Sequence, residues 1–434
     1  MLHPVLEAVF LAFEEAGVRW CLLRTPADFG TPSGGDVDLL VDPAHIESVR
    51  RVMEACGFAP LPTRNHGVHT CFLSYHRPTD CWIWLDLVTE LSFGPHSALR
   101  TRAERGCLAR RQRDGAVVLA LDDAFWVLLL HCLLDKGAIA PRHRKRLEEL
   151  VAAVRADSPL ARVVEAVCPA GWTPARMTES VSRGDWITLE QLAPPLTTAW
   201  MRQDSIGPWQ MFVLRSSRLM DKLWDLRRRR GLSIALLGPD GAGKSTLAMG
   251  IEHSFIFPVR LVYMGLTGGL LRHIARLHVP GLVFLGRLLV LWCRYLIARY
   301  HQVRGRLVVF DRYVYDAMVP HPERLNWLRR ASRRLDRHAC PGPDMVLVLN
   351  APGEVMHARK GEYNPRQLEE WRQHFLALEG RIPQLEILDT TQPKDAVRAD
   401  VIDRIWQRYV ARWRSQCFGT ADAMPEPEPK PASE

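Results

Sequence analysis

A glycine-rich run, GPDGAGKST, begins at Gly238 and has the spacing G-x-x-x-x-G-K-[ST] of a phosphate-binding loop. Its glycines would let backbone N–H groups turn toward phosphate oxygens, and a helix after the loop would direct its positive dipole end at the same anion. Lys244 would reach the β- and γ-phosphates, and the Ser245 hydroxyl would bind Mg²⁺. The run predicts binding of ATP and Mg²⁺ by Gly238, Asp240, Gly241, Ala242, Gly243, Lys244, Ser245 and Thr246.

Asp311 and Arg312 directly follow the apolar run RLVVF, which predicts a strand. Open α/β sheets bind their ligands outside the carboxyl ends of the strands, so we expect this pair at the same sheet edge as the loop. The carboxylate would hold the water shell of a metal or the attacking group, and the arginine would neutralise a transferring phosphate. A surface ion pair is the alternative interpretation.

A basic segment, HARKGEYNPR, begins at His357 and predicts a helix–loop–helix that carries Arg359, Lys360 and Arg366. A mobile basic loop that closes over phosphates excludes water and supplies charge in the transition state. The alternative is a solvated helix end. Its position after the predicted strand DMVLVLN favours the functional interpretation.

Three carboxylates are the candidate catalytic and metal-binding residues of the N-terminal part. Asp36 and Asp38 are two apart on a predicted strand, so both would lie on one face, and Asp86 lies on a later predicted strand. Three such carboxylates would hold two Mg²⁺ ions for in-line attack on a nucleoside triphosphate. Arg24 and Lys136 are candidate phosphate contacts. A strand edge with solvated aspartates is the alternative.

The predicted strands and helices that position these residues divide the chain into two sheet-containing parts, a helical connector and a tail. Residues 231–415 alternate strands (SIALL, LVYMG, RLVVF, DMVLVLN, LEILDT) with helices, which predicts a parallel sheet covered on both faces. One of these helices is expected at 281–300. Residues 1–150 predict a β-β-α-β-β order followed by two helices, which is a mixed α+β sheet domain. We expect a helical connector at 151–230 and a disordered Pro- and charge-rich tail at 416–434.

Composition narrows the class of protein. The 434 residues carry 57 Lys and Arg against 48 Asp and Glu, and the excess is uneven, because residues 1–150 hold 17 basic and 19 acidic side chains. A basic C-terminal part suits phosphorylated ligands, nucleic acid or an anionic membrane surface. Ten cysteines without a C-x-x-C pair indicate reduced thiols, and we expect a cytoplasmic protein.

The apolar stretch at 281–300 contains Arg287 and Arg294 on one helical face. An arginine at the centre of a bilayer is costly, so this stretch predicts an amphipathic helix of a soluble domain and no transmembrane segment. Attachment to a membrane surface stays open.

The C-terminal motifs together resemble the thymidylate kinase family of P-loop kinases over about 185 residues. The resemblance implies roles for Lys244, Ser245, Asp311 and Arg312 with ATP and the phosphoryl group, and a lid role for Arg359. It also implies that the acidic loop residue, Asp240, lies near the acceptor. The family's Arg-Glu-Pro-Gly-Gly segment is replaced here by VYMGLTGGLLRH, so a kinase is predicted more firmly than thymidine monophosphate as its acceptor.

The N-terminal carboxylates resemble those of the nucleotidyltransferase fold shared by polymerase-β-like and aminoglycoside-modifying families, over about 150 residues. The segment LLRTPADFGTPSGGD differs from the usual Gly-Ser helix start of these families. The resemblance implies a nucleotidyltransferase-like domain that depends on Asp36, Asp38 and Asp86.

The leading functional hypothesis is a Mg-ATP-dependent phosphotransferase for a small nucleotide or sugar-phosphate-type acceptor, with an N-terminal nucleotidyltransferase-like module. Two alternatives stay open: a nucleic-acid end-processing kinase and nucleotidyltransferase, and an ATP-sensing regulator whose first domain is silent. Nucleic acid is not the favoured partner, because no base-stacking motif or OB-like pattern is visible. A homodimer is also left open.

Overall fold

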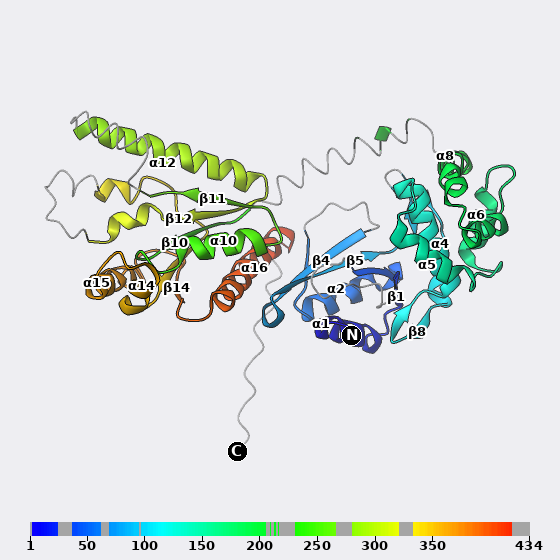
Figure 1. Cartoon of the computed structure of the whole chain (residues 1–434), viewed down its shortest axis with the longest axis horizontal. Coiled ribbons are helices and arrows are strands. Elements are labelled where there is room, and N and C mark those ends of the chain that lie inside the picture. The colour runs from blue at the N-terminus through cyan, green and yellow to red at the C-terminus, as the bar shows by residue number, and fades with distance from the viewer. Residues whose placement is uncertain are drawn as a thin grey trace, which may run out of the picture. The chain divides into compact units, whose positions relative to one another are not determined.

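The computed structural model describes residues 2–24, 37–61, 69–94, 97–204, 209, 212–213, 216, 231–265, 280–320 and 333–418. The chain forms two compact units, Met1–Trp224 and Asp225–Glu434 (Figure 1). Three predicted features lie outside the described residues. They are Asp36 of the carboxylate set, the part of VYMGLTGGLLRH that follows Gly265, and most of the predicted tail.

The second unit is built on a five-stranded sheet in which every neighbouring pair is parallel. Its order is β11-β12-β10-β13-β14, so the first strand of the unit lies at the centre. The central strand is buried along its whole length, as expected of a parallel sheet covered on both faces. The strands are β10 (Ser233–Leu237), β11 (Val259–Tyr263), β12 (Leu307–Asp311), β13 (Met345–Asn350) and β14 (Leu385–Asp389).

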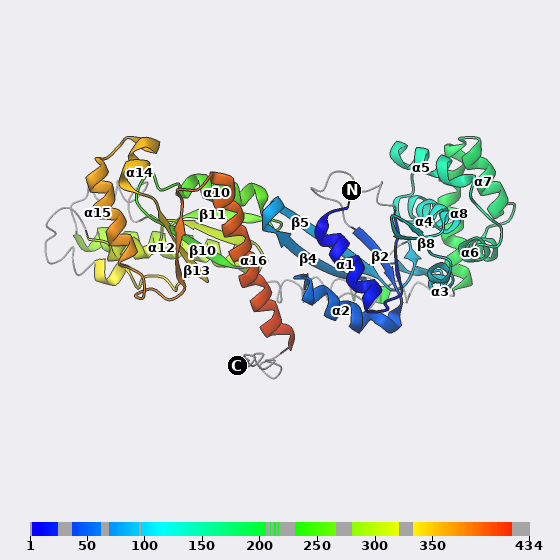
Figure 2. The ribbon, with the colours of Figure 1, turned by 90° about the horizontal axis from the view of Figure 1, so that it is seen from below.

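Helices cover both faces of this sheet, which confirms the α/β layout predicted for this part. Parallel crossovers are right-handed, and the step from β10 to β11 runs opposite to the later steps along the sheet. The first crossover helix therefore lies on one face and the later ones on the other. Figure 2 shows α10 and α16 side by side. The helices are α10 (Lys244–Ser254), α12 (Pro280–Val303), α14 (Gly353–Lys360), α15 (Pro365–Leu376) and α16 (Lys394–Phe418), with a 3-10 turn, η6, at Val314–Met318.

The long helix α12 matches the amphipathic helix expected at 281–300. Its buried side chains, Leu291 and Ala298, belong to a core cluster with alternate residues of β10, such as Ala235 and Leu237. No helix among the described residues combines the length and the apolar character needed to span a bilayer.

The first unit is built on a mixed seven-stranded sheet in the order β3-β4-β5-β2-β1-β9-β8. The predicted β-β-α-β-β order is present as β1, β2, α2, β4 and β5, and the two-residue strand β3 after α2 was not predicted. β2 pairs in parallel with β5, and the hairpin β4–β5 is antiparallel. The strands are β1 (Trp20–Leu22), β2 (Val37–Val41), β3 (Ala59–Pro60), β4 (His69–His76), β5 (Cys81–Val88), β8 (Gln112–Asp114) and β9 (Ala116–Val118), with a separate pair β6 (Ser92–Phe93) and β7 (Leu99–Arg100).

Helices of the first unit continue well beyond the sheet. Where the run DDAFWVLLLHCLLDKG (122–137) predicts one helix, the structure has α4 followed by a π-helix at His131–Lys136. The helices in the segment predicted as a connector share one core cluster with α4. Leu160, Met177 and Trp200 belong to this cluster together with Trp126. The helices are α1 (Pro4–Glu15), α2 (Ile46–Ala55), α3 (Glu104–Ala109), α4 (Leu121–Leu130), α5 (Pro141–Val151), α6 (Pro159–Val167), α7 (Pro174–Ser182) and α8 (Trp186–Gln203).

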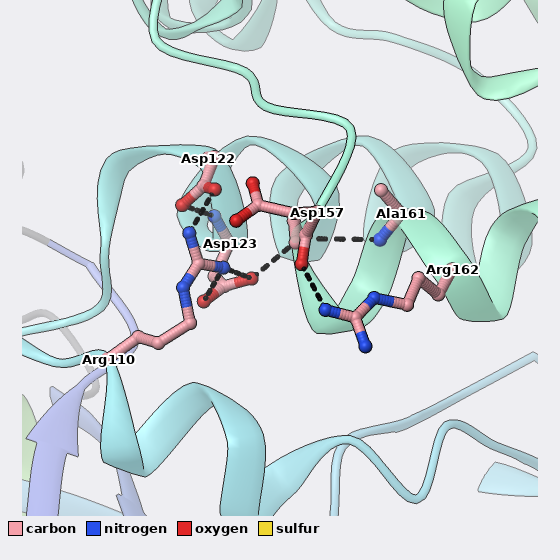
Figure 3. A network of polar contacts seen from close by, with 7 residues as sticks. Arg110, Asp122, Asp123, Asp157, Ala161 and Arg162 are labelled. Atoms are coloured by element: carbon pink, nitrogen blue, oxygen red, sulfur yellow. Dashed lines mark hydrogen bonds and ion pairs between the residues drawn. The ribbon is translucent and has the colours of Figure 1, made fainter.

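A buried polar network ties α6 to α4 (Figure 3). Arg110 donates to Asp122 at 2.5 Å and to both carboxylate oxygens of Asp123 at 3.2 Å. The hydroxyl of Ser158, the N-cap of α6, donates to Asp123 at 2.7 Å. Burial raises the pKa of Asp123, and the Ser158 hydrogen bond and the Arg110 charge oppose that rise. The network therefore stabilises the packing of α6 against α4, because a buried carboxylate that loses its partners destabilises the folded protein.

Candidate functional site

The glycine-rich loop follows β10, at the carboxyl end of the central strand, where open α/β sheets bind ligands. Gly238, Gly241 and Gly243 have φ angles of 141°, 86° and 101°, which L side chains rarely adopt. A Cβ on Gly241 would lie 2.5 Å from the carbonyl oxygen of Met356 in α14. The loop conformation therefore depends on glycine at these positions, as the motif predicts.

Lys244 is the first residue of α10 and its side chain is buried in the loop. Its ammonium donates to the carbonyl oxygens of Gly238 at 2.8 Å and Pro239 at 2.7 Å, and lies 3.7 Å from Asp240. Burial lowers the pKa of Lys244, and the nearby positive charge of Arg312 lowers it further. The loop thus holds the lysine nitrogen inside the ring of backbone groups that would surround a phosphate.

Ser245 and Asp311 come together as the sequence predicts. Asp311 ends β12 and lies opposite Leu236 of β10 in the parallel register. The Ser245 hydroxyl donates to the Asp311 carboxylate at 3.4 Å. A hydroxyl beside a carboxylate is a donor set that suits Mg²⁺, which takes oxygen ligands and keeps several waters.

Arg312 turns toward the loop from the end of β12. Its φ of 65° is unusual for a residue with a side chain and marks local strain of the kind found at functional sites. The guanidinium donates to Asp240 at 2.7 Å and lies 3.5 Å from Asp316. Burial favours the neutral form, but Asp316 and Asp240 outweigh it and raise the pKa of Arg312.

Asp316 belongs to the site, although the sequence reasoning did not select it. It lies on η6, four residues after Arg312, with only 16% of its side chain exposed. Burial raises the pKa of Asp316 to about 6, although Arg312 and Lys244 both act to lower it. The available signal was the acidic residue shortly after the Asp-Arg pair in DRYVYD. The short turn that brings it back was not visible as a pattern.

A pocket of about 410 Å³ lies beside the loop. It is bounded by α10, by the turn between β14 and α16, and by Arg359 of α14. Arg359 donates to the Thr390 carbonyl at 2.8 Å, so the predicted lid arginine forms part of the pocket wall. Lys360 pairs with Glu362 at 3.0 Å. The residues that line the pocket include Gly243, Thr246, Leu349, Arg359, Thr390 and Arg398.

In the first unit, Asp38 and Asp86 lie directly opposite one another on the parallel strands β2 and β5. Arg24 donates to Asp38 at 2.5 Å, and His69 lies 3.2 Å from Asp86. Within the part of the chain that the structure describes, no group of three or more His, Cys, Asp or Glu side chains could hold a metal ion. The predicted third carboxylate, Asp36, lies outside that part.

Arg24, which donates to Asp38, belongs to a group of basic side chains that act on His143. Burial lowers the pKa of His143 in α5, and the positive charges of Arg142, His131, Arg24 and Lys136 lower it further. The two phosphate contacts predicted from the sequence, Arg24 and Lys136, therefore act on the same histidine.

No protein-family model matches the chain, and no curated protein matches it. Among solved structures, the chain is similar to a thymidylate kinase from Candida albicans, with 19% sequence identity and a TM-score of 0.35. The similar part covers 42% of this chain and 93% of that one.

Proposed function

We propose that the second unit is a Mg-ATP-dependent phosphotransferase. The observation that carries the proposal is the meeting of three groups at one sheet edge: the glycine-rich loop with Lys244 inside it, the Ser245–Asp311 pair, and Arg312 bound to Asp240. Each group has a separate task in phosphoryl transfer, which depends on positioning and on neutralising charge.

The chain's own groups would act on the phosphates as follows. Loop N–H groups and the start of α10 bind the β- and γ-phosphates, and Lys244 exchanges its carbonyl partners for phosphate oxygens. Mg²⁺, held through Ser245 and Asp311, would supply charge neutralisation between these phosphates. Arg312 then stabilises charge on the transferring group, while Asp240 holds the guanidinium in place.

The pocket beside the loop supports a nucleoside triphosphate as the donor. Its volume of about 410 Å³ lies in the range of small-ligand pockets, and it opens next to Gly243 and Thr246. Leu349 offers an apolar wall, and the guanidinium groups of Arg359 and Arg398 offer planar surfaces for a base. We assign this pocket to the adenosine of ATP.

The acceptor would bind on the Arg312 side of the loop. Asp240 and Asp316 flank Arg312 there, so the site presents one cation between two carboxylates. Such a set can hold both a phosphate oxygen and a hydroxyl group. We propose a small nucleotide or a sugar-phosphate-type molecule as the acceptor.

For the first unit we propose a nucleotidyltransferase-like site at Asp38 and Asp86, with Asp36 as the third carboxylate. The supporting observation is the direct pairing of Asp38 with Asp86 on parallel strands, which puts both carboxylates on the same face of the sheet. Arg24, Lys136 and Arg142 would bind the triphosphate of the donor. Arg24 and His69, which contact the two carboxylates, would have to move when Mg²⁺ binds.

Labelled ATP tests both assignments. The full chain is incubated with α- or γ-labelled ATP, Mg²⁺ and a metabolite pool, as wild type, Asp311→Asn and Asp38→Asn/Asp86→Asn. We expect Asp311→Asn to abolish transfer of γ-label only, and the double variant to abolish transfer of α-label only. Exposed Asp114→Asn is the control.

The remaining alternatives have their own outcomes in the same assay. Transfer to added oligonucleotides, with affinity that falls steeply as salt rises, would identify nucleic-acid end processing. Binding of ATP without transfer of either label would identify a nucleotide sensor.

A further inference from the structure

Asp316 places a second carboxylate beside Arg312, in addition to the one that holds the guanidinium. Its side chain is 16% exposed and lies 3.5 Å from Arg312, whereas Asp240 accepts from the same guanidinium at 2.7 Å. Arg312 therefore has a closer anionic partner in Asp240. A buried carboxylate without close partners costs stability, and such groups gather at functional sites. Holding Arg312 in place does not by itself account for Asp316.

The turn that carries Asp316 is fixed by Arg333. The Arg333 guanidinium donates to the Asp316 carbonyl at 3.0 Å. It also donates to the carbonyls of Ala317 at 3.3 Å and Val319 at 2.6 Å. Carbonyl groups at the end of a helical turn have no partner within the turn, so the arginine both satisfies them and fixes the turn. Asp316 is therefore held through its own backbone, independently of Arg312.

The charges that act between Asp316 and its surroundings are those of Arg312 after β12, Lys244 of α10, Asp240 in the loop and Arg333. Burial raises the pKa of Asp316 to about 6, although Arg312 and Lys244 act to lower it. A carboxylate with a pKa near the working pH is ionised but can take up a proton, as a general base must. Lys244 and Arg312 are also the groups assigned to the phosphates, so this carboxylate lies beside the position proposed for the γ-phosphoryl group.

The sheet edge next to Arg312 presents an aromatic hydroxyl. β11 ends at Tyr263 and is followed by the uncharged Met264 and Gly265. Tyr263 is 45% exposed and lies close enough to act on the pKa of Arg312. Arg294 of α12 also reaches this edge, where its guanidinium donates to the Gly265 carbonyl at 3.2 Å and lies over the Tyr263 ring. An exposed ring with a polar tip suits contact with a sugar or a nucleoside.

The charges on this side of the loop favour a neutral attacking group. A phosphate as the attacking group would bring negative charge next to Asp240 and Asp316, and like charges in a partly buried site repel one another. A hydroxyl group brings no charge, and it donates a hydrogen bond that an ionised carboxylate accepts. A hydroxyl must also lose its proton during the attack, whereas an ionised phosphate oxygen has none to lose. A carboxylate beside the phosphoryl group therefore matches an alcohol.

We propose that the acceptor reacts through a hydroxyl group, as in a sugar or a nucleoside, and that Asp316 is the catalytic base that takes its proton. The inference rests on the proposed phosphotransferase activity of the second unit. The hydroxyl oxygen attacks the γ-phosphorus of ATP while its proton passes to the Asp316 carboxylate. The bond from the γ-phosphorus to the β–γ bridging oxygen breaks, and its electron pair leaves with ADP. The product is a phosphate monoester, whereas attack by a phosphate oxygen would give a diphosphate.

The chemical form of the product tests the acceptor class. The full chain is incubated with ATP, Mg²⁺ and the small-molecule fraction of a cell extract, and in parallel with glycerol, glucose, uridine, uridine monophosphate or inorganic phosphate. The phosphorylated product is isolated and examined by ³¹P NMR. We expect a new phosphorus atom that couples to protons on carbon and not to a second phosphorus atom. This measurement uses the wild-type chain and does not depend on the folding of a variant.

Asp316→Asn tests the base. We expect kcat to fall roughly 100-fold or more, with little change in ATP affinity by calorimetric titration, which also shows that the variant is folded. The wild-type kcat should fall as the pH is lowered through about 6, because the base becomes protonated, and the variant should lack this dependence. The matched control is Asp400→Asn, since Asp400 is 17% exposed and pairs at 3.0 Å with an arginine four residues away, Arg404.

Each contrary outcome has a distinct meaning. A diphosphate product overturns the inference and leaves the phosphotransferase standing. Wild-type kcat in Asp316→Asn overturns the base, as does a reduced kcat that keeps the dependence on pH near 6, because Asp316 would then act only by supporting Arg312. Absence of any transfer by the wild type refutes the phosphotransferase itself, and the inference with it.

Discussion

Arg312 donates a hydrogen bond of 2.7 Å to Asp240, which ties the residue after β12 to the glycine-rich loop after β10. The two strands are neighbours in the sheet, with Leu236 opposite Asp311. Motifs more than sixty residues apart in the sequence are thereby held as one unit. The proposed phosphotransferase activity depends on this link, because it fixes the guanidinium beside the loop that would hold the phosphates.

Replacing Arg312 by lysine should distinguish the contribution of its positive charge from that of its planar guanidinium geometry. Lysine keeps the positive charge but loses the planar fork that reaches both Asp240 and Asp316. We expect kcat for γ-phosphoryl transfer to fall roughly 100-fold or more while ATP binding changes little. Steady-state kinetics and calorimetric titration with ATP measure the two quantities. Arg260→Lys, at the start of β11, is the control, and an unchanged kcat in Arg312→Lys would contradict the assigned role.

The stability of the second unit should depend on pH through the ionisation of Asp316. Burial raises the pKa of Asp316 from 3.8 to about 6, so the folded protein retains a proton that the unfolded chain releases between these values. The stabilising contribution of this group is therefore complete below about pH 4 and is lost as the pH rises through 6.

Asp316→Asn, which cannot ionise, should have a higher Tm than the wild type at pH 7.5, and this difference should shrink at pH 5. Differential scanning calorimetry at the two pH values measures it, with the exposed Asp114→Asn as control. A Tm deficit of equal size at both pH values would show that the Asp316–Arg312 ion pair outweighs the burial of the carboxylate.

Gly241→Ala should disable the loop. The φ of 86° strains any residue with a Cβ, and the new methyl group would lie 2.5 Å from the Met356 carbonyl oxygen. We expect the affinity for ATP to fall at least roughly tenfold, because the loop must move to relieve the contact. Gly57→Ala is the matched control, since its φ of 80° adds strain but its Cβ would meet nothing within 4 Å. Equal ATP affinity in both variants would argue against the assigned loop geometry.

Ser158→Ala should destabilise the first unit without affecting either site. It removes the 2.7 Å donor to the fully buried Asp123 and the N-cap hydroxyl of α6. The expected loss in free energy of unfolding is about 1–3 kcal/mol. Denaturant titration measures it, with Ser182→Ala as control because its hydroxyl bonds only to a carbonyl within α7. An equal loss in free energy of unfolding for Ser182→Ala would contradict the stabilising role of the polar network.

The sequence predicted the parts of the second unit that depend on local pattern. An apolar run followed by glycines and Lys-Ser indicates a strand, a loop and a helix, and Asp311 with Arg312 at a strand end could be placed at the same edge. Asp316 was missed because its position depends on η6, whose five residues carry no periodic signal. The hydrogen bond between Arg312 and Asp240 depends on the left-handed backbone conformation of Arg312, which could not be predicted from an arginine at this position.

In the first unit, period two along the strand predicted that Asp36 and Asp38 share a face, and this stays a prediction because Asp36 lies outside the described residues. The direct pairing with Asp86 depends on register between strands, which is set by the whole sheet. His69 lies beside Asp86 for the same reason, because β4 and β5 pair as a hairpin. The packing of α6–α8 into the core of this unit was also not visible, since helical periodicity shows that a face is buried but not against which element.

Transfer of γ-label from ATP by Lys244→Ala is the most direct test of the glycine-rich loop as the phosphoryl-donor site. The Lys244 side chain is buried within the loop, and the partners of its ammonium, two carbonyl oxygens and the Asp240 carboxylate, all belong to the loop, so we expect its removal to leave the rest of the fold in place. We expect label transfer to a small molecule by the wild type and by Arg260→Ala, and a loss of roughly 100-fold or more in Lys244→Ala. Transfer at the wild-type rate by Lys244→Ala would contradict the assignment of this loop as the phosphoryl-donor site.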